Sequence, residues 1–168
     1  MFNIRKAGGG ERMKKKIAIL VAILVIAFVV AGCSTADDSG QLKPKALERK
    51  NDEGGLEMNI IFANPLGQGK DGYLTFVVQM DNHSYNLDEY EFSKYAALID
   101  DKGNGPKGNP TWEVTGGGGH HVINTLLFPN DGFITPDTEY IKLIIKDFID
   151  VPEREFIWEK EFLGIKKE

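Results

Sequence analysis

Alternation of apolar and polar residues dominates the chain from Leu56 onward. In residues 56–62, every second position is apolar (Leu56, Met58, Ile60, Phe62), and the same period of two returns along the rest of the chain. A period of two is typical of a strand with one buried face. It is found in residues 56–62, 74–80, 92–99, 111–115, 121–128, 139–147 and 155–162. The pattern predicts about seven short strands and no long helix.

Turn-forming residues separate these segments. Clusters of Gly, Pro, Asn and Asp occur at residues 64–67, 100–105, 116–119, 129–132 and 151–152. Short alternating strands with turns at this spacing favour an antiparallel sandwich over a barrel. We therefore predict an all-β fold, an antiparallel β-sandwich, over residues 56–168.

Several segments resemble the immunoglobulin-like, telokin-like domains of bacterial lipoproteins. They are residues 77–84 (VVQMDNHS), 91–92 (EF), 97–104 (ALIDDKGN), 119–129 (GHHVINTLLFP) and 141–147 (IKLIIKD). The later glycine of the family pattern is replaced by Asn124 or Thr125. The resemblance implies an immunoglobulin-like sandwich, and it says little about function because such sandwiches host many roles.

The N-terminal part has the pattern of an export signal. Three lysines at residues 14–16 precede an uncharged, largely apolar run at residues 17–32, which ends directly before Cys33. A membrane-spanning helix needs about 20 apolar residues, whereas the core of a signal peptide needs about 7 to 15, and this run is nearer the second length. An uncleaved anchor helix is the alternative. The lysines also make Met13 a better start than Met1, although either fits the sequence.

Residues 30–33 (VAGC) resemble the lipobox of bacterial lipoproteins. The resemblance implies a diacylglycerol on Cys33, cleavage between Gly32 and Cys33, and loss of residues 1–32 as a signal peptide. It places the chain on the extracytoplasmic face of the cell membrane, held by palmitate-type acyl chains. Residues 33–55 are polar and rich in Ser, Asp, Gly and Lys, so they are predicted to form a flexible tether.

Charge and cysteine content narrow the functional classes. The chain has 20 basic and 25 acidic residues, and removal of residues 1–32 leaves 14 basic and 24 acidic residues, a formal charge of −10. This balance argues against nucleic acid as a partner and against attraction to anionic lipid. Because Cys33 is the only cysteine, the sandwich has no disulfide and depends on its hydrophobic core.

The candidate polar site consists of the three histidines, His83, His120 and His121. Neighbouring residues of a strand point to opposite faces, so His120 and His121 are not expected to share one ion. The segment at residues 100–105 lacks the ligand pattern of a calcium loop and is predicted to be a turn. No nucleophile elbow or Ser/His/Asp set is apparent, and no catalytic residue, metal or cofactor is predicted.

The leading hypothesis is a non-enzymatic, lipid-anchored binding domain of the cell envelope. Its expected partners are the membrane, through the diacylglycerol on Cys33, and an envelope protein. The alternative is a small metal-binding or metal-dependent hydrolytic lipoprotein that uses His83, His120, His121 and loop aspartates. A calcium site of another kind than the EF-hand, among Asp81, Asp88 and Asp100, is a separate alternative.

Overall fold

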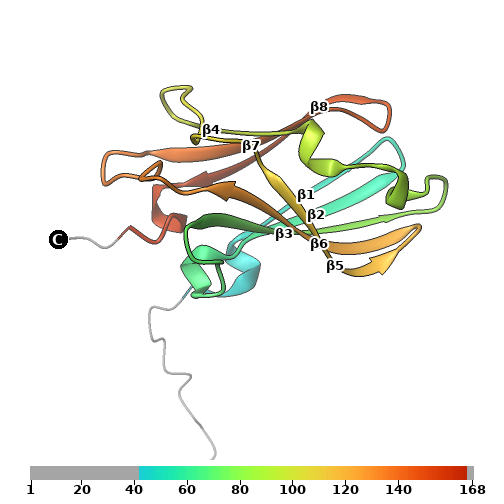
Figure 1. Cartoon of the computed structure of the whole chain (residues 1–168), viewed down its shortest axis with the longest axis horizontal. Coiled ribbons are helices and arrows are strands. Elements are labelled where there is room, and N and C mark those ends of the chain that lie inside the picture. Colours follow the sequence, from blue (N-terminus) through green and yellow to red (C-terminus); the bar gives the residue numbers. More distant parts are fainter. Residues whose placement is uncertain (1–41, 166–168) are drawn as a thin grey trace, which may run out of the picture. The chain divides into compact units, whose positions relative to one another are not determined.

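A computed structural model describes residues 42–165, which form eight strands and five short 3₁₀ helices (Figure 1). The strands are β1 (Glu48–Glu53), β2 (Leu56–Phe62), β3 (Tyr73–Asn82), β4 (Ala96–Asp100), β5 (Thr111–Gly118), β6 (His121–Pro129), β7 (Tyr140–Phe148) and β8 (Val151–Glu159). The 3₁₀ helices are η1 (Pro44–Ala46), η2 (Asn64–Leu66), η3 (Leu87–Glu89), η4 (Phe92–Tyr95) and η5 (Lys160–Phe162). Within these residues, no helix has the length and apolar character needed to cross a bilayer.

The strands form two antiparallel sheets, so the predicted all-β sandwich is confirmed. The five-stranded sheet has the order β1-β2-β3-β6-β5, and the three-stranded sheet has the order β4-β7-β8. If β2, β3, β6 and β5 are taken as strands A, B, E and D, and β4, β7 and β8 as C, F and G, the order is that of a constant-type immunoglobulin domain. β1 is an additional strand on the outer edge of β2.

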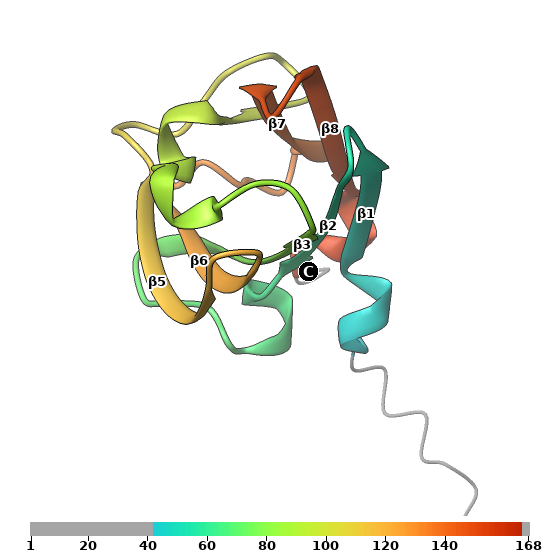
Figure 2. The same cartoon turned by 90° about the vertical axis from the view of Figure 1, so that its right-hand side faces the viewer.

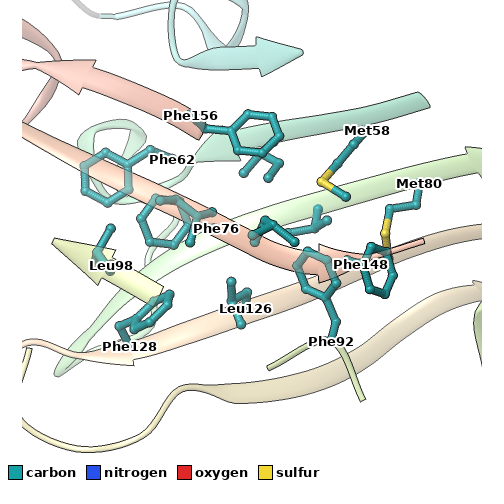
Figure 3. Packing of buried hydrophobic residues seen from close by; sticks show 14 of the residues in the cluster. Met58, Phe62, Phe76, Met80, Phe92, Leu98, Leu126, Phe128, Phe148 and Phe156 are labelled. Carbon is teal, nitrogen blue, oxygen red and sulfur yellow. The ribbon is translucent and has the colours of Figure 1, made fainter. Parts of the chain in front are cut away.

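Aromatic residues from both sheets fill the space between them (Figure 3). The Phe62 and Phe76 rings of the large sheet stack with their centroids 5.1 Å apart, and the Trp158 ring of the small sheet lies 5.2 Å from Phe76. All three side chains are fully buried. Burial of large rings removes much apolar surface from water, and this packing joins the sheets without a disulfide.

The prediction that residues 33–55 form a flexible tether is wrong for the second half of this segment. Residues 48–53 pair with β2 along the whole strand, from Glu48 opposite Ile61 to Glu53 opposite Leu56. Leu47 is fully buried directly before this strand. The folded domain therefore begins earlier than Leu56, and its eight strands exceed the predicted seven by β1. Residues 33–41 of the predicted tether, the signal segment and Cys33 lie outside the described residues.

Four other boundaries differ from the predicted ones. Residues 92–95 form the 3₁₀ helix η4 rather than the start of a strand, and residues 160–162 form η5 rather than the end of one. β5 continues through Gly118 because the glycines of this segment pair with β6. The turn predicted at Val151 and Pro152 lies instead at Ile149 and Asp150, since Phe148 already pairs with Val151.

A buried arginine joins the two sheets at the side where β1 and β8 meet. Arg154 of β8 is 1% exposed, and its guanidinium donates hydrogen bonds to Asn51 Oδ1 (2.9 Å), Phe148 O (2.6 Å) and Glu53 O (3.1 Å). Burial lowers the pKa of Arg154, and the negative charge of Glu53 opposes this shift only in part. Trp158 strengthens the same side, since its indole N–H donates to Leu47 O at 2.7 Å.

We expect Arg154→Met to lower the free energy of unfolding by about 3 kcal/mol, because it leaves buried carbonyl groups without a donor. Amide hydrogen exchange of β1 is expected to accelerate. Lys146→Ala is the matched control on the same hairpin: the exposed Lys146–Glu153 pair spans 3.5 Å and contributes about 0.5 kcal/mol or less. Urea unfolding of both variants checks this, and equal losses would contradict the role given to Arg154.

Candidate binding site at the loop end

Three connections of the sandwich meet at one end, which Figure 2 shows face on. They are the β3–β4 loop (residues 83–95), the β5–β6 turn (residues 119–120) and the β7–β8 turn (residues 149–150), and together they form the loop end. Leu87 N donates to Gly119 O at 2.7 Å, and Tyr85 Oη donates to Asp150 Oδ2 at 3.0 Å. The hydrogen bonds show that the three connections are packed against one another.

Asn82, at the end of β3, sets the course of the β3–β4 loop. Its side chain is 3% exposed, and its Oδ1 accepts hydrogen bonds from Ser84 N (2.9 Å) and Tyr85 N (2.6 Å). Its Nδ2 donates to His120 O at 3.3 Å, which ties the loop to the β5–β6 turn. This residue therefore acts as a structural bracket, in the Asx-turn manner of loop-starting asparagines.

The β7–β8 turn is strained. Ile149 and Asp150 both have positive φ, at 48° and 54°, as a two-residue type I′ hairpin requires, and Asp147 has φ 49°. A β-branched residue rarely adopts this conformation, so packing must hold Ile149 in place. Its side chain is 6% exposed within the core, and Asp150 is held by Tyr85.

A cleft of about 550 Å³ opens between the β3–β4 loop and β5. Tyr90 and Tyr95 line it from the loop, and Trp112 and Val114 line it from β5. The Trp112 ring packs 4.9 Å from the ring of Phe92, which is buried, so this wall of the cleft is anchored in the core. The cleft thus offers aromatic surface on a rigid support.

The rim of the cleft is acidic. Asp88, Glu89 and Glu91 line it together with a single lysine, Lys94. Lys94 Nζ lies 2.7 Å from Glu91 Oε2, and this hydrogen bond raises the pKa of Lys94. Asp88 Oδ2 accepts a hydrogen bond from Gly119 N at 2.9 Å. The cleft therefore presents excess negative charge to an approaching ligand.

Val114 is the most exposed large apolar residue of the described chain, at 76%. Its position in β5 is nevertheless an inward one, because its partner Asn124 in β6 is 4% exposed. The small sheet has only three strands, so it does not cover this part of β5. Asn124 Oδ1 accepts from Thr115 N at 2.9 Å and supports the bulge between Val114 and Gly116.

The structure brings the predicted histidines to the loop end but gives them different partners. His121 Nδ1 lies 2.7 Å from Asp81 Oδ1, whereas His120 Nδ1 lies 2.8 Å from Tyr85 O. The ring of His83 lies near that of His121, with centroids 6.3 Å apart. In residues 42–165, no three His, Cys, Asp or Glu side chains are grouped closely enough to hold a metal ion.

The three aspartates of the candidate calcium site lie apart. Asp81 belongs to β3 and Asp88 to the β3–β4 loop. Asp100 ends β4 and forms a tight turn, accepting hydrogen bonds from Lys102 N (2.9 Å) and Asn104 N (2.8 Å). Burial raises the pKa of Asp100, but hydrogen bonds from Asn104 and Lys102 outweigh burial and leave this pKa below its usual value. The turn predicted at residues 100–105 is thus confirmed.

The cleft residues Tyr90, Tyr95, Trp112 and Val114 were not predicted as a site. One signal in the sequence pointed to it: a connection rich in aromatic residues, with Tyr85, Tyr90, Phe92 and Tyr95 close together. Phe92 uses its ring for the core, and the tyrosines remain partly exposed. The sequence does not show which of these aromatic residues pack in the core and which line a binding surface.

Comparison of the chain with protein-family models, curated proteins and solved structures gave no match. The function of the cleft is therefore inferred from its residues and geometry.

We expect His121→Ala to raise the pKa of Asp81 toward its usual value of 3.8, because the hydrogen bond from His121 is the main cause of its lowering. A lowered carboxyl pKa in the folded state stabilises the fold above the unfolded-state pKa, and this stabilisation is lost as the pH falls through the folded pKa. Carbon-detected NMR titration of the Asp81 carboxyl measures the shift. His120→Ala, whose ring bonds Tyr85 instead, should leave it unchanged; an equal shift in both variants would refute the assignment.

Proposed function

We propose that this chain is a non-enzymatic, lipid-anchored binding protein of the cell envelope, which uses the loop end to bind a partner protein outside the membrane. The VAGC segment that ends at Cys33 supports the anchor. Two or three acyl chains on one cysteine give stable attachment, whereas a single chain binds only marginally. The anchor would keep the domain at the membrane surface.

The cleft is the observation that carries the binding role. Tyr, Trp and exposed apolar side chains are typical of protein interfaces, and here Tyr90, Tyr95, Trp112 and Val114 line one opening. Its acidic groups are held by neighbours, as Glu91 is by Lys94 and Asp88 by Gly119. Such groups suit recognition by charge and shape better than proton transfer, so we favour binding over catalysis.

The geometry gives the metal-dependent alternative little support. His83 and His121 are neighbours, yet Asp81 already occupies one nitrogen of His121, and His120 is bound to the carbonyl of Tyr85. A zinc site needs at least three protein ligands aimed at one point. We therefore do not propose a metal site.

Cys33→Ala is expected to release the chain from the membrane fraction, because the acyl chains have no other attachment point. Ser34→Ala, one residue further along, keeps the thiol and should stay in that fraction. Immunoblotting of fractions from cells that express each variant provides the measurement. A Cys33→Ala chain that has lost residues 1–32 and still sediments with membranes would disprove lipid anchoring.

A photo-crosslinking residue at Glu89, on the cleft, is expected to give one discrete adduct in intact cells. The same residue at Glu155, an exposed position on β8, is the control and should give none. Mass spectrometry of the adduct then shows whether its partner is a protein. Equal labelling at both positions would contradict a specific binding role for the cleft.

A further inference from the structure

We propose that the free edge of β5 binds an extended, basic segment of the partner protein, which adds as a further strand beside the cleft. This inference rests on the proposed binding function and names the partner's chemistry and mode of binding. Three features of the described residues carry it: the phase of the backbone hydrogen bonds, the protection of the other sheet edges, and the charge of the cleft.

One hydrogen bond at the loop end shows which residues of β6 direct their backbone N–H and C=O groups toward β3 and which toward β5. Asn82 N donates to His120 O at 3.0 Å, so β6 residues with even numbers direct their backbone groups toward β3. The pairing of β3 with β6 keeps one register from Asp81–His121 to Tyr73–Pro129. The direction of the backbone groups therefore alternates regularly along the whole of β6. Odd-numbered residues of β6 therefore direct their backbone groups toward β5.

The partners of those odd-numbered residues in β5 are Thr111, opposite Leu127, and Glu113, opposite Thr125. Trp112 and Val114 alternate with them, so their N–H and C=O groups point away from β6. No strand of residues 42–165 lies on that side of β5. The two residues whose side chains line the cleft thus also present the unpaired backbone groups.

The other sheet edges carry features that resist strand addition. β1 is charged at five of six positions (ERKNDE), and Arg154 and Trp158 of β8 hold its two ends. β8 carries Pro152, and β4 has only five residues. Charge, proline and short length are the usual protections of sheet edges. The stretch Thr111–Val114 has a single charged residue and is rich in strand-forming residues.

The cleft selects for basic side chains on the added strand. Every second side chain of such a strand would point into the cleft, where the carboxylates Asp88, Glu89 and Glu91 outnumber Lys94. An arginine there can stack on the rings of Trp112 or Tyr95 and reach these carboxylates. A second copy of this chain fits less well, since the exported part carries a charge of −10 and would repel itself.

The test uses the full chain in detergent and a fluorescent peptide of three Thr-Arg repeats as the probe. Fluorescence anisotropy should show saturable binding that weakens with salt, and a Thr-Glu peptide should not bind. Val114→Pro removes an outward N–H that the domain's own pairing does not use, and an edge strand tolerates such a proline. We expect it to weaken binding about tenfold, in line with loss of one or two backbone hydrogen bonds. Val114→Thr keeps the N–H and the branched shape, so it should weaken binding much less than Val114→Pro does.

A second probe makes the test independent of how Val114→Pro folds. The same Thr-Arg peptide with an N-methyl group on every residue keeps its charge but has no backbone N–H to donate along either edge, so its binding should be lost. Glu89→Gln combined with Glu91→Gln should weaken binding and reduce its salt dependence.

Several outcomes would overturn strand addition. They are equal binding of the methylated and unmethylated peptides, equal binding of the Thr-Glu peptide, absence of binding, and a Val114-dependent dimer in sedimentation velocity. None of them would alter the membrane release of Cys33→Ala or an adduct at Glu89, so a failure of strand addition is distinguishable from a failure of the proposed function.

Discussion

The buried guanidinium of Arg154 is the interaction on which the shape of the domain depends. It lies between the edge of one sheet and the edge of the other, and it satisfies carbonyl groups at the end of β1 and at the β7–β8 turn. These hydrogen bonds hold β1 and β8 together and close one side of the sandwich. The opposite side, formed by β4 and β5, stays open. The cleft lies on that open side because the small sheet is two strands narrower than the large one. The cleft thus forms because two sheets with different numbers of strands are joined at one side only.

The loop end is ordered by polar side chains rather than by apolar packing alone. Asn82 and Asp88 use their side-chain oxygens to hold backbone N–H groups of the β3–β4 loop and the β5–β6 turn. Gly117 shows how tight this region is: it has φ 76°, and an added Cβ would lie 2.2 Å from the carbonyl oxygen of His121. An ordered loop loses little conformational entropy when it binds a partner, which favours affinity.

Much of the sandwich could be predicted from alternation, and the exceptions share a physical cause. β1 has no apolar alternation, because an edge strand that is held by Arg154 and by pairing with β2 needs no buried face of its own. Arg154 occupies an inward position in the pattern that contains Phe156 and Trp158, yet its charge hides this in the sequence. Val114 shows the opposite case, because it is an apolar residue at an inward position that stays exposed. Both depend on what lies across the sandwich, which a one-dimensional pattern does not contain, and so the histidines were predicted as the site while the cleft was not.

The exposed edge of β5 raises the question of why it does not drive aggregation. The bulge between Val114 and Gly116, supported by Asn124, interrupts the strand after four residues, and the glycines beyond it have little propensity to extend a sheet. An edge of this length can pair with a short segment but offers a poor template for a continuous fibre. The acidic rim adds repulsion between copies. The same features that limit self-association therefore leave room for one short, oppositely charged strand, and this combination separates a binding edge from an unprotected one.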